Sequence, residues 1–298
     1  MQTPMIAVSG GKGGTGKTTV AVNLALAFKQ DGLNVLLVDA DVDAPNVHIL
    51  LSTKRKKIDT VYAFEPKFNF DECVLCGLCA QHCRIHAIMQ VGDKYPMYFP
   101  DICTHCGSCM LVCPTNAITE GKKEMGWIYE GQAYGVDLLM GELKLGEASA
   151  ATVVTELKDR LEEIRKNGKY DIIIIDTSPG AHCDVLRAVM DTEETIAVTE
   201  PTPFGAHDLE RLIRLLEVVE SPVKIVIDRA NITEGSSVIE KVAEKYNAPI
   251  ISRIPYDDLA VEAYAKGKPV IVEYPDAPAS LAIKEVMMKI KEELGIAR

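Results

Sequence analysis

The sequence lacks two features that would point to a membrane or to nucleic acid. No apolar run approaches the roughly 20 residues that a membrane-spanning helix needs, and the densest run, 172–175, is enclosed by Asp171 and Asp176. Positive charge is also in short supply, since 32 Lys and Arg stand against 43 Asp and Glu, for a net charge of −11. Because affinity for nucleic acid comes largely from Lys and Arg on phosphates, we expect no nucleic-acid partner and no stable membrane insertion.

The first residues also lack the long apolar segment of an export signal. Residues 5–8 form a short apolar run that leads straight into glycines, without a cleavage site. In such a chain, the nine cysteines favour metal ligation over disulfides. The expectation is a cytoplasmic protein in a reducing compartment.

What the sequence does contain is an alternation of apolar runs and helical patterns that is typical of βαβ units. The runs are continuous, as in parallel strands that are covered on both faces. We therefore expect an α/β fold with a doubly wound, mainly parallel sheet. The expected strands are 5–9, 35–38, 172–175, 195–199, 223–227 and 249–252, and the expected helices are 17–30, 152–165, 206–219, 236–246, 257–266 and 280–294.

A phosphate-binding loop lies between the first strand and the first helix. Gly11 to Thr18 spell G-x-x-x-x-G-K-T, in the strand-to-helix context that this motif requires. The glycines let backbone N–H groups turn toward phosphate oxygens, and the helix dipole favours the same charge. Lys17 would reach the β- and γ-phosphates, and the Thr18 hydroxyl would ligate Mg²⁺. The expected nucleotide contacts are Gly11, Lys12, Gly13, Gly14, Thr15, Gly16, Lys17, Thr18 and Thr19.

Two cysteine quartets interrupt the βαβ pattern. Both have the spacing C-x2-C-x2-C-x3-C, and the residues around them repeat as well, which predicts two pseudo-symmetric halves. Thiolates favour iron–sulfur clusters or zinc. In two-cluster ferredoxins with this spacing, the fourth cysteine of each run serves the other cluster. We expect one 4Fe–4S cluster on Cys73, Cys76, Cys79 and Cys113 and a second on Cys103, Cys106, Cys109 and Cys83; zinc or unliganded cysteines are the alternative.

The phosphate loop carries an additional lysine, so that residues 12–18 read K-G-G-T-G-K-T. This pattern resembles the deviant Walker A motif of the MinD/ParA/Mrp and nitrogenase iron-protein ATPases. The resemblance implies an ATPase that forms a homodimer with nucleotide at its interface, where Lys12 contacts phosphate across the dimer. It covers 1–64 and 122–298, with 65–121 as an inserted ferredoxin-like α+β domain that resembles bacterial ferredoxins.

Further roles follow from the resemblance. Residues 38–41 resemble switch I, which implies that Asp39 holds Mg²⁺-bound water and that Asp41 positions the attacking water. Residues 176–180 resemble Walker B with switch II, so that Asp176 would hold Mg²⁺ through water. The alternative for each carboxylate is a capping or solvated strand-end side chain. The implied catalytic residues are Lys12, Lys17 and Asp41, and the implied Mg²⁺ site is Thr18, Asp39 and Asp176.

The purine side of the site departs from the family pattern. The family often has Asn where this chain has Asp228, which could still accept a hydrogen bond from a base amine; Arg229 and Asn231 are alternatives. Pro255 lies where relatives pass the adenine. The resemblance thus implies base contacts from Asp228, Arg229 and Pro255.

Three functions follow as hypotheses. The favoured one is an ATP-gated electron carrier that presents ATP-controlled 4Fe–4S clusters to a protein redox partner. The alternatives are an Mrp-type ATPase that delivers iron–sulfur clusters to an acceptor protein, and a non-redox, MinD-like positioning switch.

Two other features are interpreted more simply. Cys183 is either a buried thiol near a dimer interface, or a redox-active or transient ligand of a cluster or metal. The closing helix, 280–294, carries apolar residues with lysines between them and is expected to pack on the core rather than on a membrane; the apolar residues are Leu281, Val286, Met287, Ile290 and Leu294.

Overall fold

The computed structural model describes residues 2–232 and 237–296, and over these residues its centre is a nine-stranded sheet with the order β11-β10-β9-β1-β8-β2-β7-β6-β3. The strands from β11 to β7 in this order pair in parallel, whereas β6 and β3 add an antiparallel edge. The expected mainly parallel sheet is confirmed. The strands are β1 (Met5–Ser9), β2 (Val35–Ala40), β3 (Arg55–Phe68), β6 (Ile118–Ala133), β7 (Val136–Leu143), β8 (Ile172–Thr177), β9 (Glu194–Thr199), β10 (Val223–Ile227) and β11 (Ile250–Arg253).

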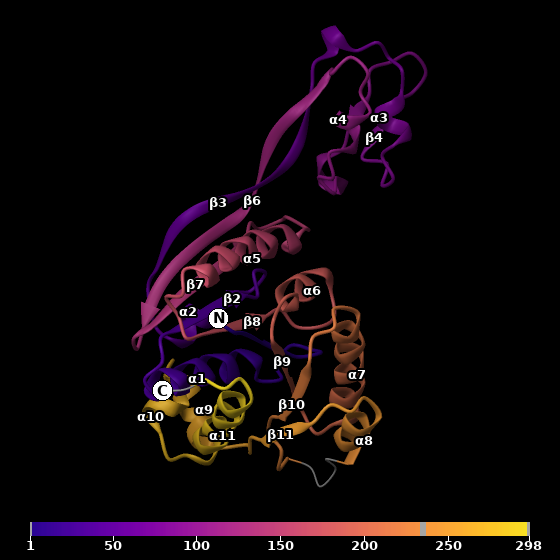
Figure 1. Cartoon of the computed structure of the whole chain (residues 1–298). Helices are drawn as coiled ribbons and strands as arrows, with labels where there is room; N and C mark the ends of the chain where they lie inside the picture. The colour runs from indigo at the N-terminus through magenta and orange to yellow at the C-terminus, as the bar shows by residue number, and fades with distance from the viewer. Residues whose placement is uncertain (1, 233–236, 297–298) are drawn as a thin grey trace.

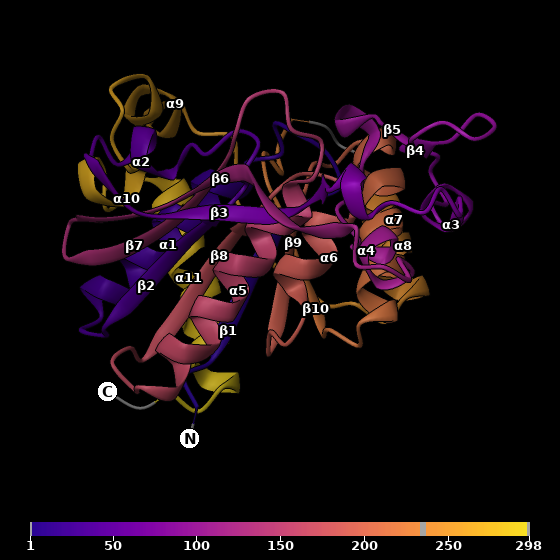
Figure 2. The same cartoon turned by 90° about the horizontal axis from the view of Figure 1, so that it is seen from above.

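Helices cover both faces of the sheet (Figures 1 and 2). Side chains alternate along the strands, so that Ile6 and Val8 of β1 enter one core and Met5 and Ala7 enter the cores of the opposite face. The first face carries α1 (Lys17–Gln30), α2 (Val47–Leu50), α9 (Asp258–Ala265), α10 (Val270–Glu273) and α11 (Pro278–Glu293). The opposite face carries α5 (Ala150–Lys166), α6 (Cys183–Val189), α7 (Pro203–Val218) and α8 (Ser237–Lys245).

The expected helices and strands all occur, with ends that differ by three residues at most where the structure describes them. Residue 236, the expected start of one helix, lies outside the described residues. The sequence did not predict β3, β6 and β7. Much of β3 and β6 is exposed or half-buried, so their apolar periodicity is weak.

β3 and β6 form a long ribbon that extends beyond the sheet. Its pairing runs from Arg55 opposite Gly131 to Phe68 opposite Ile118. Figure 1 shows the cysteine-containing segment at the far end of this ribbon, away from the parallel strands. We call residues 69–117 the cysteine module. The expected domain limits, at 64/65 and 121/122, therefore fall inside paired strands rather than in loops.

The two halves of the cysteine module repeat the same turns. Gly77 and Gly107 precede equivalent short helices with φ of 74° and 72°, a left-handed conformation that favours glycine. Buried Ala-Ile pairs follow at 87–88 and 117–118. The predicted pseudo-symmetry is confirmed. The elements are η1 (Phe70–Glu72), α3 (Leu78–Gln81), β4 (Ile88–Met89), β5 (Met97–Tyr98), η2 (Pro100–Ile102) and α4 (Ser108–Leu111).

The closing helix α11 packs against the core, as expected. Ile283, Val286 and Ile290 are buried there. Leu281 is 52% exposed, because it lies on the side of the helix opposite Ile290. No described helix is both long enough and apolar enough to cross a membrane.

Shortening one side chain on each side of α11 should show how much of its stability comes from packing against the core. Ile290→Ala removes a fully buried side chain and should lower the free energy of unfolding by about 2–5 kcal/mol. Leu281→Ala, on the exposed side, should change it by no more than about 0.5 kcal/mol. Anaerobic urea unfolding followed by circular dichroism measures both, and equal losses would contradict the packing described here.

Candidate nucleotide site and cysteine cavity

The phosphate loop connects β1 to α1 through glycines that other residues could not replace. Gly16 has a φ of 85°, and a Cβ there would lie 2.5 Å from Oδ2 of Asp228. A Cβ on Gly10 would lie 2.8 Å from the carbonyl oxygen of Val198. The helix begins immediately, since the Val20 N–H donates to the Gly16 carbonyl at 2.8 Å. The loop is thus enclosed by the ends of β9 and β10.

Two aspartates meet beside this loop at the carboxyl ends of β2 and β8. Asp39 and Asp176 are paired in the strand register, and each is at most 1% exposed. The Asp39 carboxylate accepts hydrogen bonds from the backbone N–H groups of Asp41 at 3.2 Å and Val47 at 3.0 Å. Both oxygens of Asp176 are buried without a hydrogen-bond partner in the described part of the chain.

Burial dominates the electrostatics of these acids. It raises the pKa of Asp176 to about 7, against the opposing effects of Thr18 and Lys17. Burial, reinforced by Asp176, raises the pKa of Asp39 as well. Burial raises the pKa of Asp41 to about 6, opposed by Lys17. Thr18 and Lys17 thus do not offset the burial of Asp176, and oxygen ligands beside a phosphate loop fit the coordination chemistry of Mg²⁺.

A cavity of about 640 Å³ opens on the α1 side of the loop. It brings residues of the phosphate loop together with all three expected base contacts, although these lie far apart in the sequence. Lys12, Asp39, Asp41 and Asp176 lie outside its lining. The site residues that line it are Gly14, Gly16, Lys17, Thr18, Thr19, Asp228, Arg229 and Pro255.

Asn231, the alternative base contact, has a different position. Its side-chain oxygen accepts a hydrogen bond from the Tyr256 N–H at 2.6 Å. Asn231 is not part of the cavity lining. It therefore holds the loop that carries Pro255 rather than facing the cavity.

Glu200 is a residue that the sequence did not single out. Its carboxylate lies 2.9 Å from Nζ of Lys12 and 2.6 Å from Nη1 of Arg229. The following turn is rigid, because Thr202 caps α7 by accepting the Gly205 N–H at 3.0 Å. No local pattern reveals these ion pairs, since they join residues from three separate loops.

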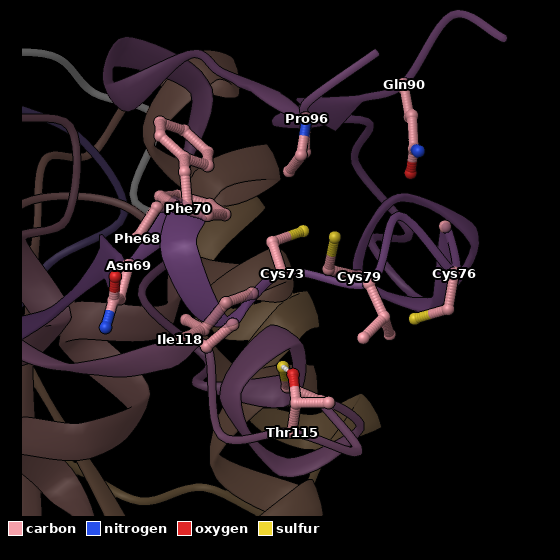
Figure 3. A pocket seen from close by; sticks show the side chains of 14 residues that line it. Phe68, Asn69, Phe70, Cys73, Cys76, Cys79, Gln90, Pro96, Thr115 and Ile118 are labelled. Atoms are coloured by element: carbon pink, nitrogen blue, oxygen red, sulfur yellow. Dashed lines mark hydrogen bonds between the residues drawn. The ribbon is translucent and has the colours of Figure 1, made fainter. Parts of the chain in front are cut away.

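The first expected cysteine set lines one small cavity in the cysteine module, namely Cys73, Cys76, Cys79 and Cys113. Figure 3 shows Cys73, Cys79 and Cys76 following one loop, with Phe70 and Pro96 also lining the cavity. The fourth residue, Cys113, comes from the other half of the repeat. The cavity thus joins the first three cysteines of one run with the fourth cysteine of the other, as the ferredoxin pattern predicts.

The second expected set shows backbone N–H groups directed at sulfur. Ala87 N–H donates to Sγ of Cys83 at 3.2 Å, and His105 N–H donates to Sγ of Cys103 at 3.4 Å. Burial, reinforced by Cys103 and Cys106, raises the pKa of the Cys109 thiol to about 11. No three Cys, His, Asp or Glu side chains within 2–232 and 237–296 are arranged to hold a single metal ion.

The ninth cysteine lies shortly after residues 176–180, the segment that resembles switch II. Cys183 is the first residue of α6 and is exposed. Cys183 is thus accessible in the single chain, and its burial near a dimer interface stays a prediction. Close by, the Gly180 N–H donates to the Gly10 carbonyl at 2.9 Å, which links the segment after β8 to the phosphate loop.

A phosphate loop between a central parallel strand and its helix, with two strand-end aspartates beside it, defines a P-loop nucleotide-binding protein. Residues 6–270 match the family model described as the CobQ/CobB/MinD/ParA nucleotide binding domain. The chain belongs to this family, and thus to the P-loop ATPases.

Individual relatives extend over most of the chain. Two proteins of Methanocaldococcus jannaschii, both named uncharacterized, are 35% and 33% identical over 89% and 96% of this chain and 90% and 96% of their own lengths. An iron-sulfur cluster carrier protein of Pyrococcus abyssi is 26% identical over 97% of this chain and 86% of its own.

A solved structure is similar throughout. The septum site-determining protein MinD of Pyrococcus horikoshii, complexed with Mg-ADP, superposes with a TM-score of 0.65 at 20% identity. The match covers 99% of this chain and 98% of that one. At this identity the likeness shows a shared fold.

The buried carboxylate of Asp176 should make stability depend on pH. Because its pKa is raised to about 7, the unfolded state loses the proton first as pH rises, and the contribution to stability falls between about pH 4 and pH 7. Asp176→Asn should therefore raise the free energy of unfolding at pH 8 by about 1–3 kcal/mol, and by less at pH 5.

Urea unfolding in magnesium-free, anaerobic buffer measures this difference. Asp159→Asn is the matched control, because Asp159 is exposed on α5. An Asp176→Asn effect that is the same at both pH values would contradict the raised pKa.

Proposed function

We propose that this protein is an ATP-hydrolysing switch that holds two 4Fe–4S clusters and passes electrons from them to a partner protein. In this proposal, residues 65–121 are an inserted ferredoxin domain. The observation that carries it is the cavity lined by Cys73, Cys76, Cys79 and Cys113. Three of these cysteines come from one half of the repeat and the fourth from the other, the distribution that a two-cluster ferredoxin uses.

The spacing of the thiols favours clusters over zinc. Structural zinc sites usually use ligand pairs that are separated by a longer stretch of chain, whereas each quartet here is one C-x2-C-x2-C-x3-C run. In a 4Fe–4S cluster each thiolate binds a different iron, so the four sulfurs surround a larger volume. Apolar walls such as Phe68 and Ile118 would keep water from the first cluster, and N–H···S bonds such as that of Ala87 to Cys83 would tune the potential of the second.

The nucleotide side of the proposal uses the predicted roles. Lys17 and the loop N–H groups would bind the phosphates, and Lys12 would add a second cation. Thr18, Asp39 and Asp176 would hold Mg²⁺, which supplies charge neutralisation of the phosphates when it is bound. Asp41 would orient the attacking water. The orphaned oxygens of Asp176 are the observation that supports the cation.

The two sites would communicate through hydrogen bonds rather than through a loose linker. After Asp41, the Val42 carbonyl accepts the N–H of Leu143 at the end of β7, at 2.8 Å. The next residue, Lys144, donates to the Met125 carbonyl of β6 at 2.8 Å. A shift of switch I on nucleotide binding would thus be felt by the ribbon that carries the cysteine module.

A homodimer with nucleotide at its interface is part of the proposal, as the resemblance implies. The Lys12 side chain is 36% exposed, and Cys183 is exposed as well, so both are accessible to a second copy of the chain. A redox partner would approach the cysteine module at the far end of the ribbon.

The second candidate is an ATPase that carries iron–sulfur clusters to acceptor proteins. The relative named as an iron-sulfur cluster carrier protein supports it. A carrier must release its cargo, whereas thiols grouped around an apolar-walled cavity favour retention. We therefore rank electron transfer first.

Metal content tests the ligand set. The anaerobically purified chain should contain roughly eight iron and eight sulfide ions, because each 4Fe–4S cluster holds four of each. Cys113→Ser should lower the iron content by removing a cavity thiol. Cys183→Ser should leave it unchanged, because Cys183 lies in α6, outside the cysteine module. Zinc in place of iron, or an unaffected Cys113→Ser variant, would reject the ligand set.

Cluster fate separates the two candidates. The reduced protein is incubated anaerobically with ATP and either a one-electron acceptor or a cluster-free acceptor protein. We expect electrons to leave faster with ATP while the iron stays on the chain. Lys17→Ala should remove the ATP effect at full iron content, because only the phosphate site changes. Iron that moves to the acceptor protein would instead favour the carrier.

A further inference from the structure

One carboxylate, that of Glu200, holds two cations of the predicted phosphate site. Its Oε2 lies 2.9 Å from Nζ of Lys12, and its Oε1 lies 2.6 Å from Nη1 of Arg229. Arg229 also donates from Nη2 to the Gly14 carbonyl at 3.0 Å. The three side chains therefore form one cluster over the phosphate loop.

The carboxylate is the fixed member of this cluster. The Glu200 side chain is 11% exposed, whereas those of Lys12 and Arg229 are 36% and 41% exposed. The Glu200 backbone is also held, because its carbonyl accepts the Thr202 N–H at 2.8 Å. A Cβ on Gly205 would lie 2.3 Å from the same carbonyl oxygen, so the start of α7 packs directly on Glu200.

We propose that Glu200 is a positioning residue of the nucleotide site, which holds Lys12 and Arg229 in the nucleotide-free chain and yields one or both to the phosphates of a bound nucleotide. This inference rests on the proposed function, since it requires that Lys12 contacts phosphate. Carboxylate and phosphate oxygens are both acceptors for these cations. The two anions therefore compete for the same donors.

The competition has two consequences. The apparent nucleotide affinity is the intrinsic affinity multiplied by the fraction of molecules in which Glu200 has released the cations. A Lys12 that is held by Glu200 of its own chain also cannot contact a nucleotide in a second copy. Glu200 thus links nucleotide binding to dimer formation, because both require the same lysine to be released.

Glu200→Gln tests the inference by removing the charge while keeping the shape. If roughly a tenth of the molecules have released the cations at rest, ATP affinity should rise about tenfold at low salt. The difference should shrink as salt screens the cluster. In a Lys12→Ala, Arg229→Ala background the gain should vanish. Calorimetric titration measures affinity, and sedimentation velocity measures the ATP-dependent dimer.

Glu210→Gln is the matched control. Glu210 also lies on the α7 side of the sheet and loses the same charge, but it pairs with Arg214 and Lys245. Its variant should bind ATP like the wild type. Glu200→Asp, which keeps the charge with a shorter reach, should give an intermediate affinity and serves if the Gln variant does not fold.

The outcomes separate this inference from the proposed function. Two results would overturn the role of Glu200 and leave the proposed function intact. In the first, the Glu200→Gln and Glu200→Asp variants bind ATP with the wild-type affinity. In the second, Glu210→Gln raises the ATP affinity as much as Glu200→Gln does. A wild-type chain that binds no ATP would reject both.

Discussion

The interaction on which the rest of the structure depends is the burial of two carboxylates at the ends of neighbouring strands. Asp39 and Asp176 face each other in register between β2 and β8, and both are removed from water. Buried charges are tolerated only when they are paired or coordinate a metal. Lys17, itself 6% exposed, lowers the pKa of Asp176 but does not offset its burial. The proposed Mg²⁺ would supply the positive charge that these two carboxylates need when they are ionised.

The same edge fixes where everything else can lie. In an open parallel sheet, ligands bind at the carboxyl ends of the strands, and here β1, β2, β8, β9 and β10 deliver the phosphate loop, the two aspartates, Glu200 and Asp228 to that edge. Gly10 and Gly16 are required because the ends of β9 and β10 approach the loop so closely. The packing of the strand ends therefore also determines the shape of the nucleotide site.

The sequence predicted the parts that depend on local patterns. The phosphate loop lies directly between its strand and its helix, and continuous apolar runs identified the buried parallel strands. The cysteine spacing grouped Cys113 with thiols about 40 positions away, and the cavity brings the same four together; their role as cluster ligands stays a proposal.

The sequence could not predict the parts that depend on pairing across the fold. β3 and β6 satisfy each other through cross-strand pairs such as Lys56 with Glu130, at 3.0 Å, so neither strand carries a strong apolar pattern of its own. Glu200 precedes a turn with two prolines, and nothing in this local sequence indicates a contact with Lys12, which only the folded chain brings close. Leu281 is apolar and yet points outward, because α11 meets the core only on the side of Ile283, Val286 and Ile290.

The antiparallel edge determines how a nucleotide signal could reach the cysteines. β6 pairs with β7 only as far as Gly126, opposite Leu143; from there to Ile118 it pairs with β3 alone. Gly126 is the point of attachment, since a Cβ there would lie 2.9 Å from Cγ2 of Val153 on α5. Beyond it the ribbon has two strands, which twist more readily than a wider sheet.

The hydrogen bond of Lys144 to Met125 lies directly beside that point, one residue from the bond of Leu143 to Val42. A movement of switch I would therefore act at the base of the ribbon, where a small rotation gives the largest displacement of the cysteine module at its far end. His105, whose ring bonds the Phe64 carbonyl at 2.9 Å, ties the second cysteine loop back to β3. The second cysteine loop is therefore joined to the ribbon by a side-chain contact as well as by the chain itself.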